Sequence, residues 1–162
     1  MQRVDFSEKY QQTPAKFVAE EGVGWEDTNA ALAGMRVCVQ RGTIHQDYLE
    51  GEYPDVDLVL YPTQDEVYLD MTSGRCDAMM ADSMALKSGF LDTEQGEGYA
   101  FFGRDHAAPE YHGEGAGVAV RKGEEALRDR FSEAIRAIRG NGVYKDINDR
   151  YFDFDVYGGG GA

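Results

Sequence analysis

The chain has 162 residues, which is enough for one substantial hydrophobic core and too few for two large ones. Its 16 Lys and Arg residues face 30 Asp and Glu residues, giving a net charge of −14. This charge opposes binding to nucleic-acid phosphates and to anionic lipid surfaces, so neither is expected as a partner. No stretch approaches the ~18 apolar residues of a membrane-spanning helix.

The N-terminus and the cysteines bear on the compartment. Residues 1–5 have neither the basic segment nor the apolar segment of a secretory signal. Cys38 and Cys76 each lie in a short apolar run without a CxxC or histidine-rich neighbourhood. Buried structural thiols are the favoured interpretation, and a bridge between them is the alternative.

The first predicted elements are a strand at Ala15 to Ala19 and a helix at Glu26 to Ala33, ended by Gly34. From residue 36 to residue 82, short β-rich runs alternate with helical runs, a pattern that predicts a βαβαβ unit. The predicted strands are 36–40, 57–61 and 76–81, and the predicted helices are 43–53 and 64–73. Continuous apolar strands of this kind predict a parallel sheet covered on both faces, with strand 36–40 in the middle.

The remaining elements are less regular. A short helix begins at Ser83, polar loops cover 92–98 and 105–114, a strand covers 99–103, and strand 117–121 has no hairpin partner nearby. Two helices follow, each with one apolar stripe. The stripes consist of Leu127, Phe131, Ile135 and Ile138, and of Val143, Ile147 and Tyr151. We expect Phe152 to Tyr157 to be an extended tail and Gly158 to Ala162 to be disordered.

The predicted sheet places a ligand site at the carboxyl ends of its strands, where the chain winds in opposite directions from strand 36–40. Thr43 opens the helix that follows Gln40, and the free N–H groups of that helix can receive a carboxylate. Asp82 follows the neighbouring strand and can hold an ammonium group. An anion site and an acid in one cleft suit an α-amino acid. On spacing alone, however, Thr43 and Asp82 are more simply helix caps.

The three histidines give no clear chemical signal. His45 lies on the first turn after Thr43 and faces either the cleft or solvent, while His106 and His112 lie in a predicted loop without metal-ligand spacing. No metal and no cofactor are therefore expected. Motifs of nucleophilic hydrolases, P-loop proteins and zinc proteases are absent, so the sequence indicates a protein that is not an enzyme.

Several stretches, taken in order, resemble the periplasmic solute-binding proteins of ABC importers for histidine, for lysine, arginine and ornithine, and for opines. The matching stretches are residues 4–10, 32–43, 72–78 with Asp82, 140–144 and 151–159. The resemblance implies a type II periplasmic-binding-protein fold, with two lobes joined by crossing hinge strands. It divides the chain into a first hinge segment at 1–14, an α/β second lobe at 15–115, and a return strand with C-terminal helices of the first lobe at 116–162.

The resemblance also implies a ligand, partners and a location. Thr43 would bind the carboxylate of a free polar or basic amino acid and Asp82 its α-ammonium group, while Gln40, Ile44 and His45 would line the same site. The partners would be the membrane subunits of the importer, and the location the periplasm. Ile44 and His45 replace the hydroxyl and amide that are common in the family. Most of the first lobe, including the arginine that clamps the carboxylate, has no counterpart in this sequence, which implies impaired binding.

The sequence leaves three alternative functions. The first is an amino-acid receptor of an ABC importer, and the second is a ligand-free interaction module derived from one. The third is a dehydratase-like enzyme on the same fold. Because the two C-terminal apolar stripes need a covering surface, we expect a homodimer or elements exchanged between chains.

Overall fold

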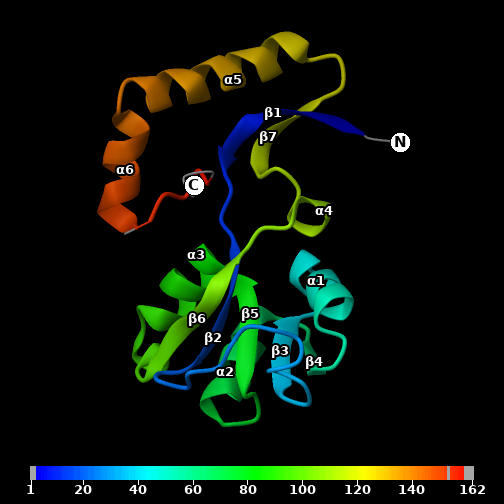
Figure 1. Cartoon of the computed structure of the whole chain (residues 1–162). Coiled ribbons are helices and arrows are strands. Elements are labelled where there is room, and N and C mark those ends of the chain that lie inside the picture. Colours follow the sequence, from blue (N-terminus) through cyan, green and yellow to red (C-terminus); the bar gives the residue numbers. More distant parts are fainter. Residues whose placement is uncertain (1–2, 153, 159–162) are drawn as a thin grey trace. The chain divides into compact units, whose positions relative to one another are not determined.

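The computed structural model describes residues 3–152 and 154–158 and divides into two compact units (Figure 1). The α/β unit comprises Pro14–Gly113, and the terminal unit combines Met1–Thr13 with Glu114–Ala162.

The α/β unit is built on one five-stranded sheet with the order β4-β3-β5-β2-β6 (Figure 1). Its strands are β2 (Ala15–Glu20), β3 (Arg36–Gln40), β4 (Asp57–Tyr61), β5 (Ala78–Asp82) and β6 (Tyr99–His106). Strands β4, β3 and β5 run parallel, which confirms the predicted position of strand 36–40 in the middle. Strand β2 runs antiparallel to both β5 and β6, so the sheet is mixed and only its first half is wholly parallel.

Helices cover both faces of this sheet because neighbouring strand residues point to opposite sides. Val37 and Val39 enter one core with Tyr48 and Leu49 of α1 (Ile44–Glu52). Cys38, between the two valines, enters the other core with residues of α2 (Gln64–Thr72), α3 (Ser83–Leu86) and the π-helix η1 (Lys87–Leu91). The apolar runs of β3 and β5 are therefore buried on both sides, as predicted.

The sequence prediction was wrong in three places within the α/β unit. The expected helix at 26–33 is instead a series of bends and turns. The expected loop at 105–114 contains the end of β6 and a short helix, α4 (Pro109–His112). The expected loop at 92–98 contains the single-turn 3-10 helix η2 (Glu94–Gly96).

The terminal unit joins the two ends of the chain. Strand β1 (Val4–Gln11) pairs antiparallel with β7 (Ala116–Arg121), so the strand without a hairpin partner finds one near the N-terminus. Helices α5 (Glu125–Gly140) and α6 (Val143–Tyr151) follow, as predicted, although Gly140 lies in the last turn of α5.

The C-terminal segment turns back on α6, so the predicted extended tail was wrong. The Asn148 side-chain amide donates to the Phe154 carbonyl oxygen at 2.9 Å and accepts from the Val156 N–H at 3.0 Å. The Val156 carbonyl oxygen in turn accepts from the Gln12 N–H at 2.8 Å. The predicted disorder at 158–162 concerns mostly residues 159–162, which lie outside the described part of the chain.

Candidate functional site

The carboxyl ends of β3 and β5 bring the predicted site residues to the same edge of the sheet. The two strands are parallel neighbours, with Val37 opposite Ala78 and Cys38 opposite Met79. Helix α1 follows β3 and packs on one face of the sheet, whereas α3 follows β5 and packs on the opposite face. This is the switch point at which open α/β sheets bind ligands.

Thr43 is the N-cap of α1, with extended backbone angles (φ −107°, ψ 159°). Its Oγ1 accepts from the Gln46 N–H at 3.4 Å and donates to the Gln40 carbonyl oxygen at 2.8 Å. Gly42 has a φ of 71°, a left-handed conformation that glycine adopts without strain, and its N–H donates to the Gln46 side chain at 2.8 Å. The capping prediction for Thr43 is confirmed, and the first turn of α1 presents the N–H groups that a helix leaves unsatisfied.

Asp82 ends β5 and is the N-cap of α3. Its Oδ1 accepts from the Met84 N–H at 2.9 Å and from the Ala85 N–H at 3.3 Å. The side chain is half-buried. Burial lowers the pKa of His45, and the negative charge of Asp82 partly offsets this effect. Asp82 is thus a helix cap, as expected, and its charge also acts on His45 in the first turn of α1.

The two residues after Thr43 differ in exposure. Ile44 is 45% exposed, whereas His45 is largely buried and its Nδ1 has no hydrogen-bond partner among the described residues. Burial, with a further contribution from the nearby His112, lowers the pKa of His45 to about 4. The imidazole is therefore neutral at pH 7.

A buried polar chain lies next to this site and was not predicted. His106, expected in a loop, is only 2% exposed, and its Nδ1 is 2.8 Å from the Tyr48 hydroxyl. Its Nε2 lies 3.2 Å from Asp27 Oδ2, and that oxygen accepts from the Arg104 N–H at 2.6 Å. Burial lowers the pKa of His106, Arg104 lowers it further, and Asp27 opposes both. Nothing in the spacing of these residues indicates that they meet.

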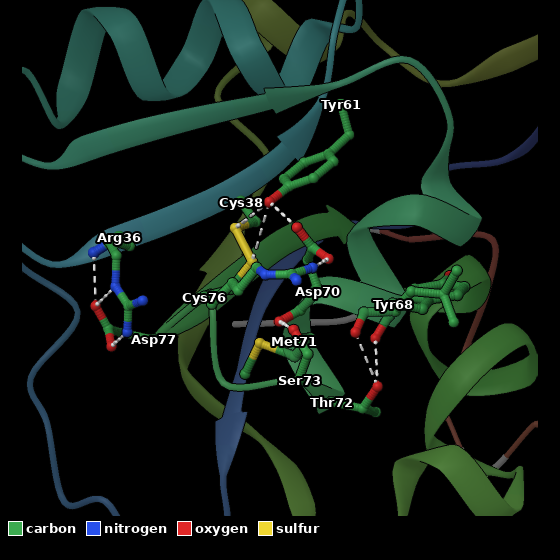
Figure 2. Close-up of a disulfide and its surroundings, with 12 residues drawn as sticks. Arg36, Cys38, Tyr61, Tyr68, Asp70, Met71, Thr72, Ser73, Cys76 and Asp77 are labelled. Atoms are coloured by element: carbon green, nitrogen blue, oxygen red, sulfur yellow. Dashed lines mark hydrogen bonds and ion pairs between the residues drawn. A yellow bond between two sulfur atoms is a disulfide. The ribbon is translucent and has the colours of Figure 1, made fainter.

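A disulfide joins β3 to the segment just before β5. Figure 2 shows Cys38 of β3 bonded to Cys76, two residues before β5, with Cα atoms 5.9 Å apart. The favoured interpretation of free buried thiols was therefore wrong. Beside the bond, the Arg36 guanidinium donates to both carboxylate oxygens of Asp77, at 3.1 and 2.6 Å, and the Arg36 N–H donates at 2.8 Å. This ion pair lowers the pKa of Asp77.

Tyr61, at the end of β4, lies over the disulfide (Figure 2). Its hydroxyl is 3.9 Å from each of the two sulfur atoms and donates to Asp70 Oδ2 at 2.7 Å. Asp70 also pairs with Arg75 at 2.8 Å. Burial and the Asp70 carboxylate raise the pKa of Tyr61 to about 12, so the phenol stays protonated. A covalent bond and an ion pair thus link β3 to the residues just before β5, and the Tyr61 hydrogen bond links β4 to α2.

In the terminal unit, α5 and α6 leave apolar side chains in contact with solvent. On α5, Leu127 is 43% exposed and Phe131 37%, although Ile135 of the same stripe is buried. On α6, Ile147 is 50% exposed and Tyr151 71%. The predicted stripes exist, and only Ile135 is fully covered by the described residues.

Two features are absent from the described residues. None of their helices has the length and apolar character that a membrane crossing requires. Among the same residues, no group of three or more His, Cys, Asp or Glu side chains could hold a metal ion.

Solved structures similar to this one include binding proteins for amino acids. One is a Salmonella typhimurium periplasmic binding protein of high arginine specificity, at 27% identity and a TM-score of 0.72, covering 92% of this chain and 65% of that one. Another is an ancestral arginine-binding protein bound to arginine, at 26% identity and a TM-score of 0.72, covering 92% and 64% of the two chains. The predicted fold class is confirmed.

The chain belongs to the bacterial extracellular solute-binding proteins, family 3, whose family model matches residues 1–154. Among curated relatives, the L-arginine-binding protein of Pseudomonas aeruginosa is 47% identical over 96% of this chain. The lysine/arginine/ornithine-binding periplasmic protein of Escherichia coli K12 is 35% identical over 97%, and the histidine-binding periplasmic protein of Salmonella typhimurium 33% over 98%. This chain spans 61–62% of the length of these relatives. The resemblance drawn from the sequence motifs is confirmed, and these relatives are named as binding proteins rather than as enzymes.

Proposed function

We propose that the chain binds a basic amino acid, with arginine as the first candidate, as part of the periplasmic receptor of an ABC importer. The names of the relatives support this ligand class, because the protein at 47% identity is an L-arginine-binding protein. Its partners would be the free amino acid and the membrane subunits of the importer.

The observation that carries the proposal is the pairing of opposite electrostatic features at one sheet edge. The N-terminus of α1 at Thr43 attracts a carboxylate, because its N–H groups and its helix dipole are positive. Asp82, on the neighbouring strand, attracts an ammonium group. Gln40 precedes the turn into α1 and its carbonyl oxygen accepts from the Thr43 hydroxyl, while Ile44 and His45 lie in the first turn of α1. A free α-amino acid carries both charges and fits this arrangement.

The direct test is thermal unfolding of the purified chain with each of the twenty amino acids and ornithine at millimolar concentration. A ligand present at ~100 times its Kd stabilises the folded state by about 2.7 kcal/mol, which raises Tm by roughly 5–10 °C for a chain of this size. We expect this shift for arginine, with smaller shifts for lysine, ornithine and histidine. No shift with any amino acid would overturn the proposal.

Two variants separate ligand binding from helix capping. Asp82→Asn keeps a side chain that caps helices as well as aspartate does but removes the charge, so we expect little loss of stability and at least a tenfold loss of arginine affinity. Thr43→Ala removes the cap of α1, and Thr63→Ala is its matched control. Thr63 caps α2 in the same way, with Oγ1 accepting from the Glu66 N–H at 3.3 Å. Both threonine variants should lose about 1 kcal/mol of stability, but only Thr43→Ala should weaken binding.

The exposed apolar stripes of α5 and α6 favour a second candidate, a ligand-free module that forms a homodimer through them. Side chains such as Ile147 and Tyr151 are at least half exposed, and contiguous apolar surface of this kind is typical of interaction sites. Sedimentation equilibrium tests it. A concentration-dependent dimer that Ile147→Ser and Tyr151→Ser abolish would support the module, whereas a monomer at all concentrations would exclude it.

A further inference from the structure

Two histidines that are distant in the sequence meet in the α/β unit. His45 lies on the first turn of α1 and His112 is the last residue of α4, and their ring centroids are 5.8 Å apart. Tyr48, one turn after His45, makes edge contacts with Tyr111 and His112, at 5.3 and 5.2 Å between ring centroids. These aromatic contacts hold α4 against α1 and fix the position of His112.

The hydrogen bonding of His112 leaves one ring nitrogen with an unused lone pair. Its Nδ1 lies 3.3 Å from the Ala108 carbonyl oxygen, which can only accept a hydrogen bond. Nδ1 therefore carries the proton in the neutral ring, and Nε2 carries the lone pair. This Nε2 is buried and, like His45 Nδ1, has no hydrogen-bond partner within residues 3–152 and 154–158. A buried polar atom without a partner costs about 1–3 kcal/mol, so two such atoms in neighbouring rings call for a physical explanation.

The separation of the two rings matches that of two imidazoles on one metal ion. Metal–nitrogen bonds of ~2.0–2.1 Å place two ring centres roughly 4.5–6.4 Å apart, depending on whether the angle at the metal is near 90° or near 180°. The 5.8 Å separation falls in this range. Metal-binding histidines also commonly donate their other ring N–H to a backbone carbonyl, as His112 does to Ala108.

Imidazole is also a suitable ligand chemically, because it binds metal ions through a ring nitrogen in its neutral form. Imidazole is a good ligand for zinc, copper and nickel and a poor one for magnesium and calcium. Asp82 adds a negative charge near His45 and offsets part of the cost of bringing a cation to this place.

We infer that His45 and His112 form a two-histidine site for a divalent transition-metal ion of the zinc, nickel and copper class. No third His, Cys, Asp or Glu ligand is available among the described residues, so the remaining coordination positions are open to water or small molecules. The site therefore binds metal reversibly, more weakly than a structural zinc site with four protein ligands. This site shares His45 with the proposed amino-acid site, so metal binding is tested in the absence of amino acids and amino-acid binding is tested separately in the same variants.

Isothermal titration of the untagged full chain with ZnCl2, NiCl2 and CuCl2, in the absence of amino acids, tests the site. We expect one ion per chain, with Cu²⁺ bound more tightly than Ni²⁺ or Zn²⁺. His45→Ala and His112→Ala should each weaken Cu²⁺ binding at least tenfold. The matched control is Glu50→Gln, which removes an exposed carboxylate from the same helix and should leave Cu²⁺ binding unchanged.

Folding and ligand binding are controlled in the same variants. Circular dichroism establishes that each variant is folded. If His112→Ala does not fold, His112→Asn, a smaller polar replacement, is tested in its place. If folded variants bind Cu²⁺ as tightly as the wild type, the inference is wrong. It is also wrong if the wild type binds none of the three ions, or if His112→Ala weakens arginine binding and leaves Cu²⁺ binding intact. In the last case the unpartnered nitrogens would serve the amino acid instead.

Discussion

Replacing both cysteines, in a Cys38→Ala/Cys76→Ala variant, should destabilise the chain through the unfolded state. The bond joins residues separated by 38 positions in the sequence. Closing a loop of this length removes conformational entropy from the unfolded chain, and the chain-entropy relation gives a stabilisation of about 4 kcal/mol at 25 °C. Because small proteins are stable by only about 5–15 kcal/mol, the variant should lose a large fraction of its stability.

Urea unfolding followed by circular dichroism measures this loss. The wild type should be compared in oxidised and reduced form, because reduction removes the covalent link but keeps both sulfur atoms. If the constraint on the unfolded chain dominates, reduction and the double substitution should have nearly the same effect. A much larger effect of the substitution would instead indicate lost packing around Cys38, which is fully buried.

Two results would refute this reasoning. One is a loss of less than about 1 kcal/mol in the double variant, which would mean that closing this loop does not restrict the unfolded chain as the chain-entropy relation requires. The other is the reaction of two thiols per chain with Ellman's reagent in the denatured, unreduced protein. Because Cys38 and Cys76 are the two cysteines of the sequence, that result would show that the bond does not form.

Three further predictions concern stability and its pH dependence. Gly96→Ala should cost about 1–3 kcal/mol in urea unfolding, because a Cβ there would overlap the Phe90 carbonyl oxygen. Gly140→Ala, with no described atom within 4 Å of the new Cβ outside its own helix, should instead stabilise α5 by up to about 1 kcal/mol, and a loss would contradict the helical assignment. Because the pKa of His106 is lower in the folded chain than its ordinary value of about 6.5, its contribution to stability is present above that pH and is lost as the pH falls below it. His106→Gln should therefore flatten the decline in stability between pH 7 and pH 5, and an unchanged slope would show that His106 takes up its proton equally well in both states.

The central half of the sheet could be predicted because its signals are local. Strands β3, β4 and β5 are short apolar runs, and the intervening helices begin at Thr43 and Thr63, whose hydroxyls cap them. Strand order then follows from the connections, since parallel strands joined by helices lie in one sheet. The pairing of β7 with β1 could not be predicted in this way, because its partner lies at the other end of the chain.

The wrong helix at 26–33 shows how tertiary contacts override local propensity. The segment has an acidic start, alanines and a final glycine, all typical of a helix. In the structure, the Asp27 carboxylate instead accepts from the Arg104 N–H, and the Asp27 carbonyl oxygen accepts from the Tyr53 hydroxyl at 2.8 Å. Both bonds tie the segment to distant elements, which fixes it as bends and turns.

The disulfide could have been predicted from an observation already available in the sequence. The expected strand order placed strand 36–40 next to strand 76–81, with Cys38 in the middle of one and Cys76 at the start of the other. Neighbouring strands lie ~4.8 Å apart, within the Cα separations that a disulfide spans. By contrast, nothing in the spacing of His45, His106 and His112 indicates a cluster, because it depends on how α1, β6 and α4 pack.

The hydroxyl of Thr43 shows why the capping role and the ligand-binding role need not exclude each other. A hydroxyl carries one proton, and that of Thr43 is donated to the Gln40 carbonyl oxygen at 2.8 Å. In this arrangement the hydroxyl cannot also donate to a ligand carboxylate, so the donors that remain are the main-chain N–H groups in the first turn of α1. Capping by Thr43 and the left-handed turn at Gly42 fix the direction of these groups. The side chain of Thr43 then contributes to anion binding by positioning the backbone that makes the contact.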